Sequence, residues 1–227
     1  MKKWMFSGLI ITMLLPAYTQ AASYGQRLCR SDADVTCIRI HPDDTWYSLW
    51  PDPEQRDLIM RLNRRNTPLR PGEVIAIPNR ATSAMALSPM EPSIAPPGKT
   101  TIIVDPKQLA WGAYDSDGQL VKWGPAAAGK SYCPDEGRAC RSPTGTFTVL
   151  NKQGSECISS KFPVPKGGAP MPYCMYFHGG YALHGSELPG TNASHGCIRM
   201  FNEDAEWLNH EFVKVGSTQV IVEPYYS

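Results

Sequence analysis

The chain centres on two short segments, Leu183–Ser186 (LHGS) and Ser194–Met200 (SHGCIRM), which hold two histidines, a cysteine and two glycines. A free cysteine has a pKa of about 8.5, so it needs a nearby base or a positive field to react as a thiolate. Histidine is the side chain most easily tuned to act as that base near neutral pH. Glycine beside the sulfur lets the backbone turn tightly and lets a substrate carbonyl approach amide N–H groups. The pattern therefore predicts a cysteine nucleophile served by a histidine.

The two segments resemble the signature of the L,D-transpeptidase (YkuD-like) catalytic domain, in which a His-Gly precedes a loop and then Ser-His-Gly-Cys. The loop between His184 and Ser194 is shorter here than in many members of that family. The resemblance implies that Cys197 is the nucleophile and His184 its base, with the Gly185 carbonyl fixing the tautomer of His184. It also implies the roles of the remaining site residues: amide N–H groups of His195, Gly196 and Cys197 for the oxyanion, Arg199 and Ser194 for the substrate, and Met171 and Tyr173 for the donor-side wall.

Some of these assignments compete with structural alternatives. Arg199 either binds a substrate carboxylate, which an arginine fork fits well, or forms a structural ion pair. Met171 and Tyr173 either line the site or simply pack. His195 is expected to orient the site rather than act as the base.

The reaction that the resemblance implies is acyl transfer on the stem peptides of peptidoglycan. The thiolate attacks the carbonyl of the third stem residue, often meso-diaminopimelate, and releases the terminal D-alanine. An amine of a second stem or of an envelope lipoprotein then takes the acyl group, whereas transfer to water makes the enzyme an L,D-carboxypeptidase. No metal or organic cofactor is expected, and carbapenems are expected to acylate the cysteine. Two further classes remain open: a non-catalytic peptidoglycan-binding or adhesion protein, and a zinc hydrolase that uses His184, His195 and Cys197.

Composition limits the partners and the fold class. The chain has 227 residues and a formal net charge of +1, which gives no electrostatic reason to expect nucleic acid or an acidic membrane surface as a partner. Its 21 prolines and 19 glycines favour a loop-rich, mainly β protein over a helical bundle. We expect a β-sandwich-like catalytic domain over residues 99–224, with a helix that Asn202 caps and Gly216 ends. Its strands are expected at Thr101–Val104, Leu109–Tyr114, Leu120–Trp123, Tyr181–His184 and Gln219–Val222, and Ser142–Val149 is expected to be a turn that leads into a further strand.

A small module is expected at residues 23–79. Asp44-Thr45, Leu62-Asn63, Leu69–Gly72 and Ile77-Pro78 resemble the landmarks of a lysin-motif (LysM) domain. The resemblance implies a βααβ fold that binds N-acetylglucosamine-containing glycans, the alternative being a packing module that binds nothing. Residues 80–98, rich in proline, alanine and serine, are expected to form an extended linker that tethers the enzyme near a polymer.

The N-terminus and the cysteines indicate export. Residues 1–22 read as a cleaved signal peptide, with two lysines followed by an apolar segment too short to span a bilayer. The mature protein is thus expected in the periplasm or at the cell wall, with no integral membrane segment. Seven cysteines leave six for pairing if Cys197 stays free. Six cysteines allow fifteen pairings, of which local pairing favours Cys29–Cys37, Cys133–Cys140 and Cys157–Cys174.

Overall fold

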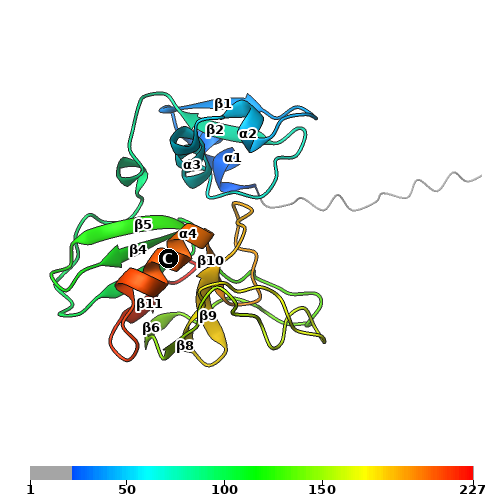
Figure 1. Ribbon diagram of the computed structural model, residues 1–227. Helices are drawn as coiled ribbons and strands as arrows, with labels where there is room; N and C mark the ends of the chain where they lie inside the picture. The colour runs from blue at the N-terminus through cyan, green and yellow to red at the C-terminus, as the bar shows by residue number, and fades with distance from the viewer. Residues whose placement is uncertain (1–21, 227) are drawn as a thin grey trace, which may run out of the picture.

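A mixed sheet of nine strands dominates the computed structural model, which describes residues 22–226. The predicted mainly β class is therefore confirmed. The strand order in the sheet is β6-β11-β3-β4-β5-β10-β9-β8-β7 (Figure 1). The strands are β3 (Thr101–Asp105), β4 (Ala110–Tyr114), β5 (Leu120–Ala127), β6 (Gly145–Thr148), β7 (Asn151–Lys152), β8 (Met175–His178), β9 (Tyr181–Gly185), β10 (Ile198–Met200) and β11 (Gln219–Val222).

The sheet is curled rather than flat. Phe147 lies on β6 at one end of the strand order and Phe177 lies on β8 near the other end, yet their ring centroids are 5.4 Å apart. Strands alternate inward and outward side chains, so a curled sheet can enclose one apolar interior. Trp111 is fully buried in that interior.

One helical segment packs into the core directly after β10. It consists of α4 (Asn202–Trp207) and a π-helical turn η2 (Leu208–Phe212). The expected cap was wrong: Phe201 is the N-cap residue, and no side chain caps the helix. Gly216 also lies beyond the helical end, in the turn before β11. The predicted apolar face is confirmed, because Ala205, Leu208 and Phe212 all belong to the core.

The N-terminal module has the expected βααβ order, preceded by a helix that the sequence reasoning missed. The additional helix starts with Ser23 and Gln26 in a reciprocal capping box, a local signal that could have predicted it. Trp46 and Trp50 are core residues, whereas Tyr47 is 70% exposed. The elements are α1 (Tyr24–Ser31), β1 (Val35–Arg39), α2 (Trp46–Leu49), α3 (Pro53–Leu62) and β2 (Val74–Pro78), with β1 and β2 antiparallel.

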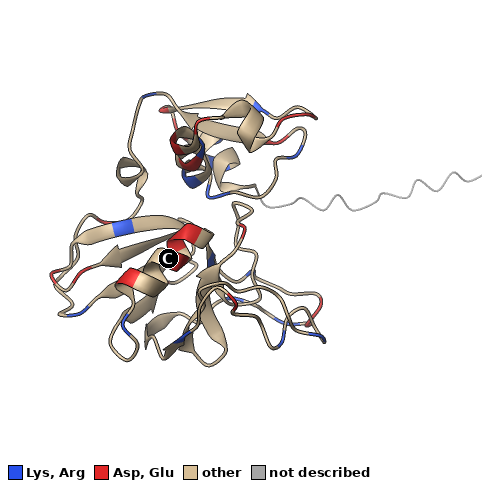
Figure 2. Cartoon of the chain, viewed as in Figure 1, with Lys and Arg blue, Asp and Glu red and all other residues tan. Residues whose placement is uncertain are grey.

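A buried ion pair joins the module to the sheet domain. Arg61 of α3 donates to both carboxylate oxygens of Asp204 on α4, at 2.9 and 3.0 Å, and Asp204 is fully buried. Lys122 of β5 approaches the same carboxylate at 3.5 Å. Burial alone would lower the pKa of Arg61, but Asp204 raises it above its ordinary value. Figure 2 shows the acidic positions on α4 and the charged positions on α3.

The segment 80–98 is docked on the sheet domain, which corrects the expected extended tether. It contains a short 3-10 helix, η1 (Met85–Leu87), and it runs beside β5 in Figure 1. The indole N–H of Trp123 donates to the Ala84 carbonyl at 2.6 Å. Further along, the Ile94 amide donates to the Gly118 carbonyl at 2.8 Å. These contacts hold the connection against the domain that follows it.

All three favoured disulfides are present, and Cys197 is the free cysteine among the described residues. The predicted signal peptide lies outside the described residues, apart from Ala22. Within residues 22–226 we find no helix with the length and apolar character that a bilayer span requires.

Candidate active site

Two neighbouring parallel strands bring the histidine and the cysteine together. In the register of β9 and β10, Leu183 pairs with Ile198 and His184 pairs with Arg199. Cys197 directly precedes β10, so the register places it opposite Ala182, two residues before His184 on β9. Both residues line one small cavity of about 70 Å³. Its lining also includes Ser159, Phe162, Ala169, Pro170, Met171, Ser186, Ser194, His195 and Arg199.

His184 is held in one tautomer. Its Nδ1 lies 2.9 Å from the carbonyl oxygen of Gly185, and a carbonyl can only accept, so Nδ1 carries the proton. Burial, together with the nearby charge of Arg199, lowers the pKa of His184 to about 4 despite the opposing effect of the Gly185 carbonyl. The imidazole is therefore neutral near pH 7, and its Nε2 is free to accept a proton.

Cys197 is a neutral thiol at rest. Burial raises its pKa, and the Ala182 amide and Arg199 offset this only in part. Its sulfur packs beside Met171 and the Cys157–Cys174 disulfide. A raised thiol pKa next to a histidine of low pKa means that the pair does not rest as thiolate and imidazolium. The proton must instead move to His184 during attack on a carbonyl.

The loop before the cysteine requires glycine at position 196. Gly196 has φ +130°, and an added Cβ would lie 2.3 Å from the ring of Tyr181. The Gly196 amide donates to Ser194 Oγ at 2.9 Å, and the Ser194 hydroxyl donates to the Cys197 carbonyl. Ser194 is buried and its hydroxyl serves the loop, so we assign it to loop support rather than to the expected substrate contact. Because the Gly196 N–H is engaged, the amides of His195 and Cys197 remain the better candidates for an oxyanion site.

Ser142 braces the same loop from a distant part of the chain. Its hydroxyl donates to the Gly196 carbonyl at 2.6 Å and accepts from the Gly129 amide at 3.1 Å. The Ser142 amide in turn donates to the hydroxyl of Tyr225 at 2.9 Å. The sequence motif that contains Ser142 signalled a turn, but nothing in it pointed to this supporting contact.

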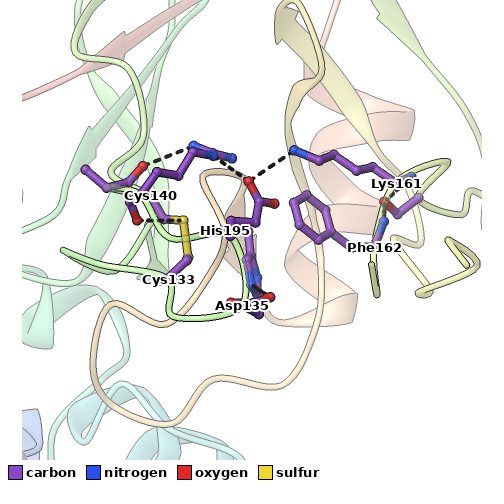
Figure 3. Close-up of polar contacts among 10 residues, drawn as sticks. Cys133, Asp135, Cys140, Lys161, Phe162 and His195 are labelled. Carbon is purple, nitrogen blue, oxygen red and sulfur yellow. Dashed lines mark hydrogen bonds and ion pairs between the residues drawn. A yellow bond between two sulfur atoms is a disulfide. The ribbon is translucent and has the colours of Figure 1, made fainter. Parts of the chain in front are cut away.

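The ring of His195 is held by two residues of neighbouring loops, Asp135 and Phe162. Its Nε2 lies 2.7 Å from Asp135 Oδ2, and its ring packs at a tilt against Phe162, with the ring centroids 4.5 Å apart (Figure 3). The hydrogen bond from His195 lowers the pKa of Asp135. These contacts agree with an orienting role for His195. Asp135 and Phe162 could not be predicted as neighbours of His195, because both lie on irregular loops that carry no recognisable pattern.

The donor atoms of the site are not grouped for a zinc ion. Among the described residues, the one set of three potential ligands within 4.8 Å is Cys133, Asp135 and His195. Cys133 is bonded to Cys140 and cannot act as a thiolate ligand. His184 and Cys197 do not belong to that set, so the geometry gives no support to the zinc-hydrolase alternative.

Arg199 has no carboxylate partner within residues 22–226, and none of their hydrogen bonds involves its side chain. Burial lowers its pKa. This favours substrate binding over the structural ion pair. Met171 lines the cavity as expected, but Tyr173 does not: its hydroxyl donates to Glu206 at 2.8 Å and its ring meets His210.

Comparison with known proteins places this site in a recognised family. The L,D-transpeptidase catalytic domain (YkuD) profile matches residues 99–222. An L,D-transpeptidase structure from Xylanimonas cellulosilytica is 24% identical, with a TM-score of 0.53 over 75% of this chain and 79% of that chain. An L,D-transpeptidase from Mycobacterium smegmatis is 24% identical, with a TM-score of 0.46 over 56% of this chain and 59% of that chain. One from Enterococcus faecium is 23% identical, with a TM-score of 0.46 over 55% of this chain and 50% of that chain. None of the curated proteins compared with the chain matches it.

Proposed function

The chain belongs to the family of L,D-transpeptidase catalytic domains (YkuD), and from this premise we propose that it cross-links or modifies peptidoglycan stem peptides through a thioester on Cys197. The observation that carries the proposal is that a free thiol and a neutral imidazole held in one tautomer line the same cavity, with the thiol donating to the Gly180 carbonyl at rest. That arrangement is a nucleophile with a general base, oriented by a third group.

The chemistry balances with this chain's own groups. The thiol proton moves to Nε2 of His184 as the sulfur bonds to the carbonyl carbon of the third stem residue. Collapse of the tetrahedral intermediate breaks the bond to D-alanine, whose amine takes the proton back from His184. An acceptor amine then attacks the thioester, loses a proton to His184 and restores the thiol. Amide N–H groups of His195 and Cys197 stabilise the oxyanion, and losing one such donor typically costs about 10²–10³ in rate.

Arg199 is proposed to bind a carboxylate of the stem. It lines the catalytic cavity as a half-buried cation, and no carboxylate among the described residues neutralises it. An anion that binds there gains charge-assisted hydrogen bonds in a partly desolvated setting.

The N-terminal module is proposed to be LysM-like and to hold the glycan of the same polymer. Its βααβ order and the exposed residue Tyr47 support this proposal: the Arg56 guanidinium lies over the Tyr47 ring at 4.5 Å from its centroid, and the opposite face of the ring is proposed to stack on a sugar. The same proposal includes export to the periplasm or cell wall, with an envelope lipoprotein amine as one of the acyl acceptors.

The decisive experiment is mass spectrometry of products from purified disaccharide-tetrapeptides, with wild-type protein and the Cys197→Ala variant. We expect wild type to release D-alanine and to form a product joined to an added amine, and the variant to do neither while keeping its thermal unfolding profile. Release of D-alanine by a folded Cys197→Ala variant would overturn the proposed nucleophile. Exclusive transfer to water, with excess amine present, would identify an L,D-carboxypeptidase instead.

A further inference from the structure

A cavity of about 540 Å³ lies where helix α1 meets the sheet domain, and the proposed reaction does not use it. Helix α1, which precedes the βααβ elements of the module, contributes Arg27 to its wall. The rest of the wall belongs to the sheet domain and includes residues 190–192, on the loop that leads to Cys197. The cavity shares no lining residue with the catalytic cavity, so any ligand it holds is a separate one.

Four cations line this cavity. They come from four separate parts of the chain: Arg27 on α1, Lys107 in the turn between β3 and β4, Lys130 after β5, and Arg141 before β6. None of the four forms an ion pair within residues 22–226, and no aspartate or glutamate of these residues lines the cavity. The whole chain has 22 basic and 21 acidic side chains, so folding gathers positive charge here that the net charge does not reveal.

Both arginines are oriented by an aromatic ring and by one hydrogen bond. The Arg27 guanidinium lies 4.9 Å from the centroid of the Tyr24 ring and donates to the Lys107 carbonyl at 3.4 Å. The Arg141 guanidinium lies 4.7 Å from the centroid of the Tyr226 ring and donates to the Tyr226 hydroxyl at 2.8 Å. A guanidinium has five N–H donors, so most of them remain available to an anion. Because the two side chains are already held, less conformational entropy is lost when an anion binds.

The backbone around the cations is also fixed. Asn192 Nδ2 donates to the Pro106 carbonyl at 2.9 Å, and its Oδ1 accepts from the Ala128 amide at 2.9 Å. The Lys130 amide donates to the Ser194 carbonyl at 3.0 Å. These bonds join the turn before β4, the end of β5 and the loop before Cys197 into one wall, which makes the cavity a preformed site.

We propose that this cavity binds a phosphorylated saccharide, a sugar that carries two phosphate groups. The inference goes beyond the proposed reaction and does not depend on it. A phosphate monoester carries about 1.5 to 2 negative charges near pH 7 and three acceptor oxygens, so two phosphates balance four cations, whereas two carboxylates leave half of the charge unmatched. Tyr226 is 67% exposed, and the ring face opposite Arg141 is proposed to stack on the sugar. A phosphate-bearing envelope glycan in this site anchors the sheet domain as well as the module.

The test is isothermal titration calorimetry of the full chain with three probes. Glucose 1,6-bisphosphate carries two phosphates on one sugar, inorganic pyrophosphate carries a similar charge without a sugar, and glucose carries no charge. We expect the bisphosphate to bind at least about tenfold more tightly than pyrophosphate, because its separated phosphates reach cations on different sides of the cavity. Glucose should not bind. The affinity for the bisphosphate should fall as NaCl is raised from about 0.05 M to about 0.3 M, since salt screens exposed charges.

A matched pair of double variants locates the site. Arg27→Gln with Lys107→Gln removes two lining cations and should weaken binding of the bisphosphate at least about tenfold. Arg30→Gln with Lys214→Gln is the control, because it removes the same two charges from exposed side chains outside the cavity, one of them also on α1; it should change Kd less than about twofold. Arg141→Lys keeps the charge but loses the planar fork, so it should weaken binding by about threefold or more. Thermal unfolding checks that each variant is folded.

Three results would overturn the saccharide site. Equal affinity for the bisphosphate and for pyrophosphate would show only a general attraction of anions to a cationic surface, and so would an equal loss of affinity in the two double variants. The third result is that wild type does not bind the bisphosphate but sediments with phosphatidylglycerol vesicles, and that Arg27→Gln with Lys107→Gln abolishes this sedimentation. It would assign the four cations to a membrane surface instead. None of these results changes the release of D-alanine that tests the proposed reaction.

Discussion

Replacing Arg61 by methionine should destabilise the protein far more than a surface charge change does. The substitution keeps most of the aliphatic stem but leaves Asp204 fully buried with one remaining cation, Lys122, at 3.5 Å. Breaking a buried pair by removing one partner typically costs about 3–5 kcal/mol. Arg61 also contacts Asp57, but that carboxylate is about half exposed and its pairing contributes little. We therefore expect a loss of about 3 kcal/mol or more at pH 7.

Urea unfolding followed by tryptophan fluorescence measures this loss, with Asp57→Asn as the control for the exposed contact. The double variant Arg61→Met with Asp204→Asn removes the stranded charge, so it should recover a substantial part of the stability. The pH dependence follows from the sign of the shift. Burial already raises the pKa of Asp204, and Arg61 opposes that rise. Without Arg61 the pKa rises further, so the folded variant is favoured when the carboxyl is protonated, and its deficit relative to wild type grows as pH rises from about 4 to about 7. A loss below 1 kcal/mol, or a double variant no more stable than Arg61→Met, would refute the reasoning.

Three further predictions concern the thiol site. Because burial lowers the pKa of His184 to about 4, kcat/KM should stay constant down to about pH 5 and fall only near pH 4. A fall in kcat/KM centred near pH 6.5 would contradict a resting state in which His184 and Cys197 are both neutral. The raised pKa of Cys197 implies slow alkylation by iodoacetamide at pH 7, increasing steeply toward pH 9 and above, whereas fast alkylation at pH 6 would show a thiolate. Ser142→Ala removes the hydrogen-bond donor to the Gly196 carbonyl, so we expect kcat to fall at least about tenfold. Thermal denaturation should show a loss of about 1–3 kcal/mol in the free energy of unfolding. An unchanged kcat would show that the loop keeps its conformation without Ser142.

The parts of the fold and site that follow from local sequence could be predicted. His184 and Cys197 lie in a motif whose glycines are explained by the local backbone. At Gly196, the positive φ angle and the close approach of the Tyr181 ring exclude a side chain. The three disulfides join cysteines that are near in sequence, with separations of 8, 7 and 17 residues. The last strand was predicted at its observed bounds because it is a short apolar run after a glycine turn.

The contacts between distant segments could not be predicted in the same way. Arg61 and Asp204 are 143 residues apart, and neither belongs to a periodic pattern that would announce a buried pair. The composition of segment 80–98 predicted an exposed tether. Its docking depends on single contacts with distant residues, such as the Trp123 indole donating to the Ala84 carbonyl, and composition carries no information about such contacts. Tyr173 was expected at the site from its place in a motif, but its hydroxyl turns toward Glu206.

The docked connection has a consequence for how the enzyme meets its polymer. Since the segment 80–98 is held along the sheet domain and Arg61 is locked to Asp204, the module and the thiol cannot swing independently. If the module binds a glycan strand, that strand lies at one fixed distance from Cys197 and in one orientation. The enzyme would then react with stem peptides at a fixed distance from the glycan that the module binds, rather than with any stem peptide that diffuses to the thiol.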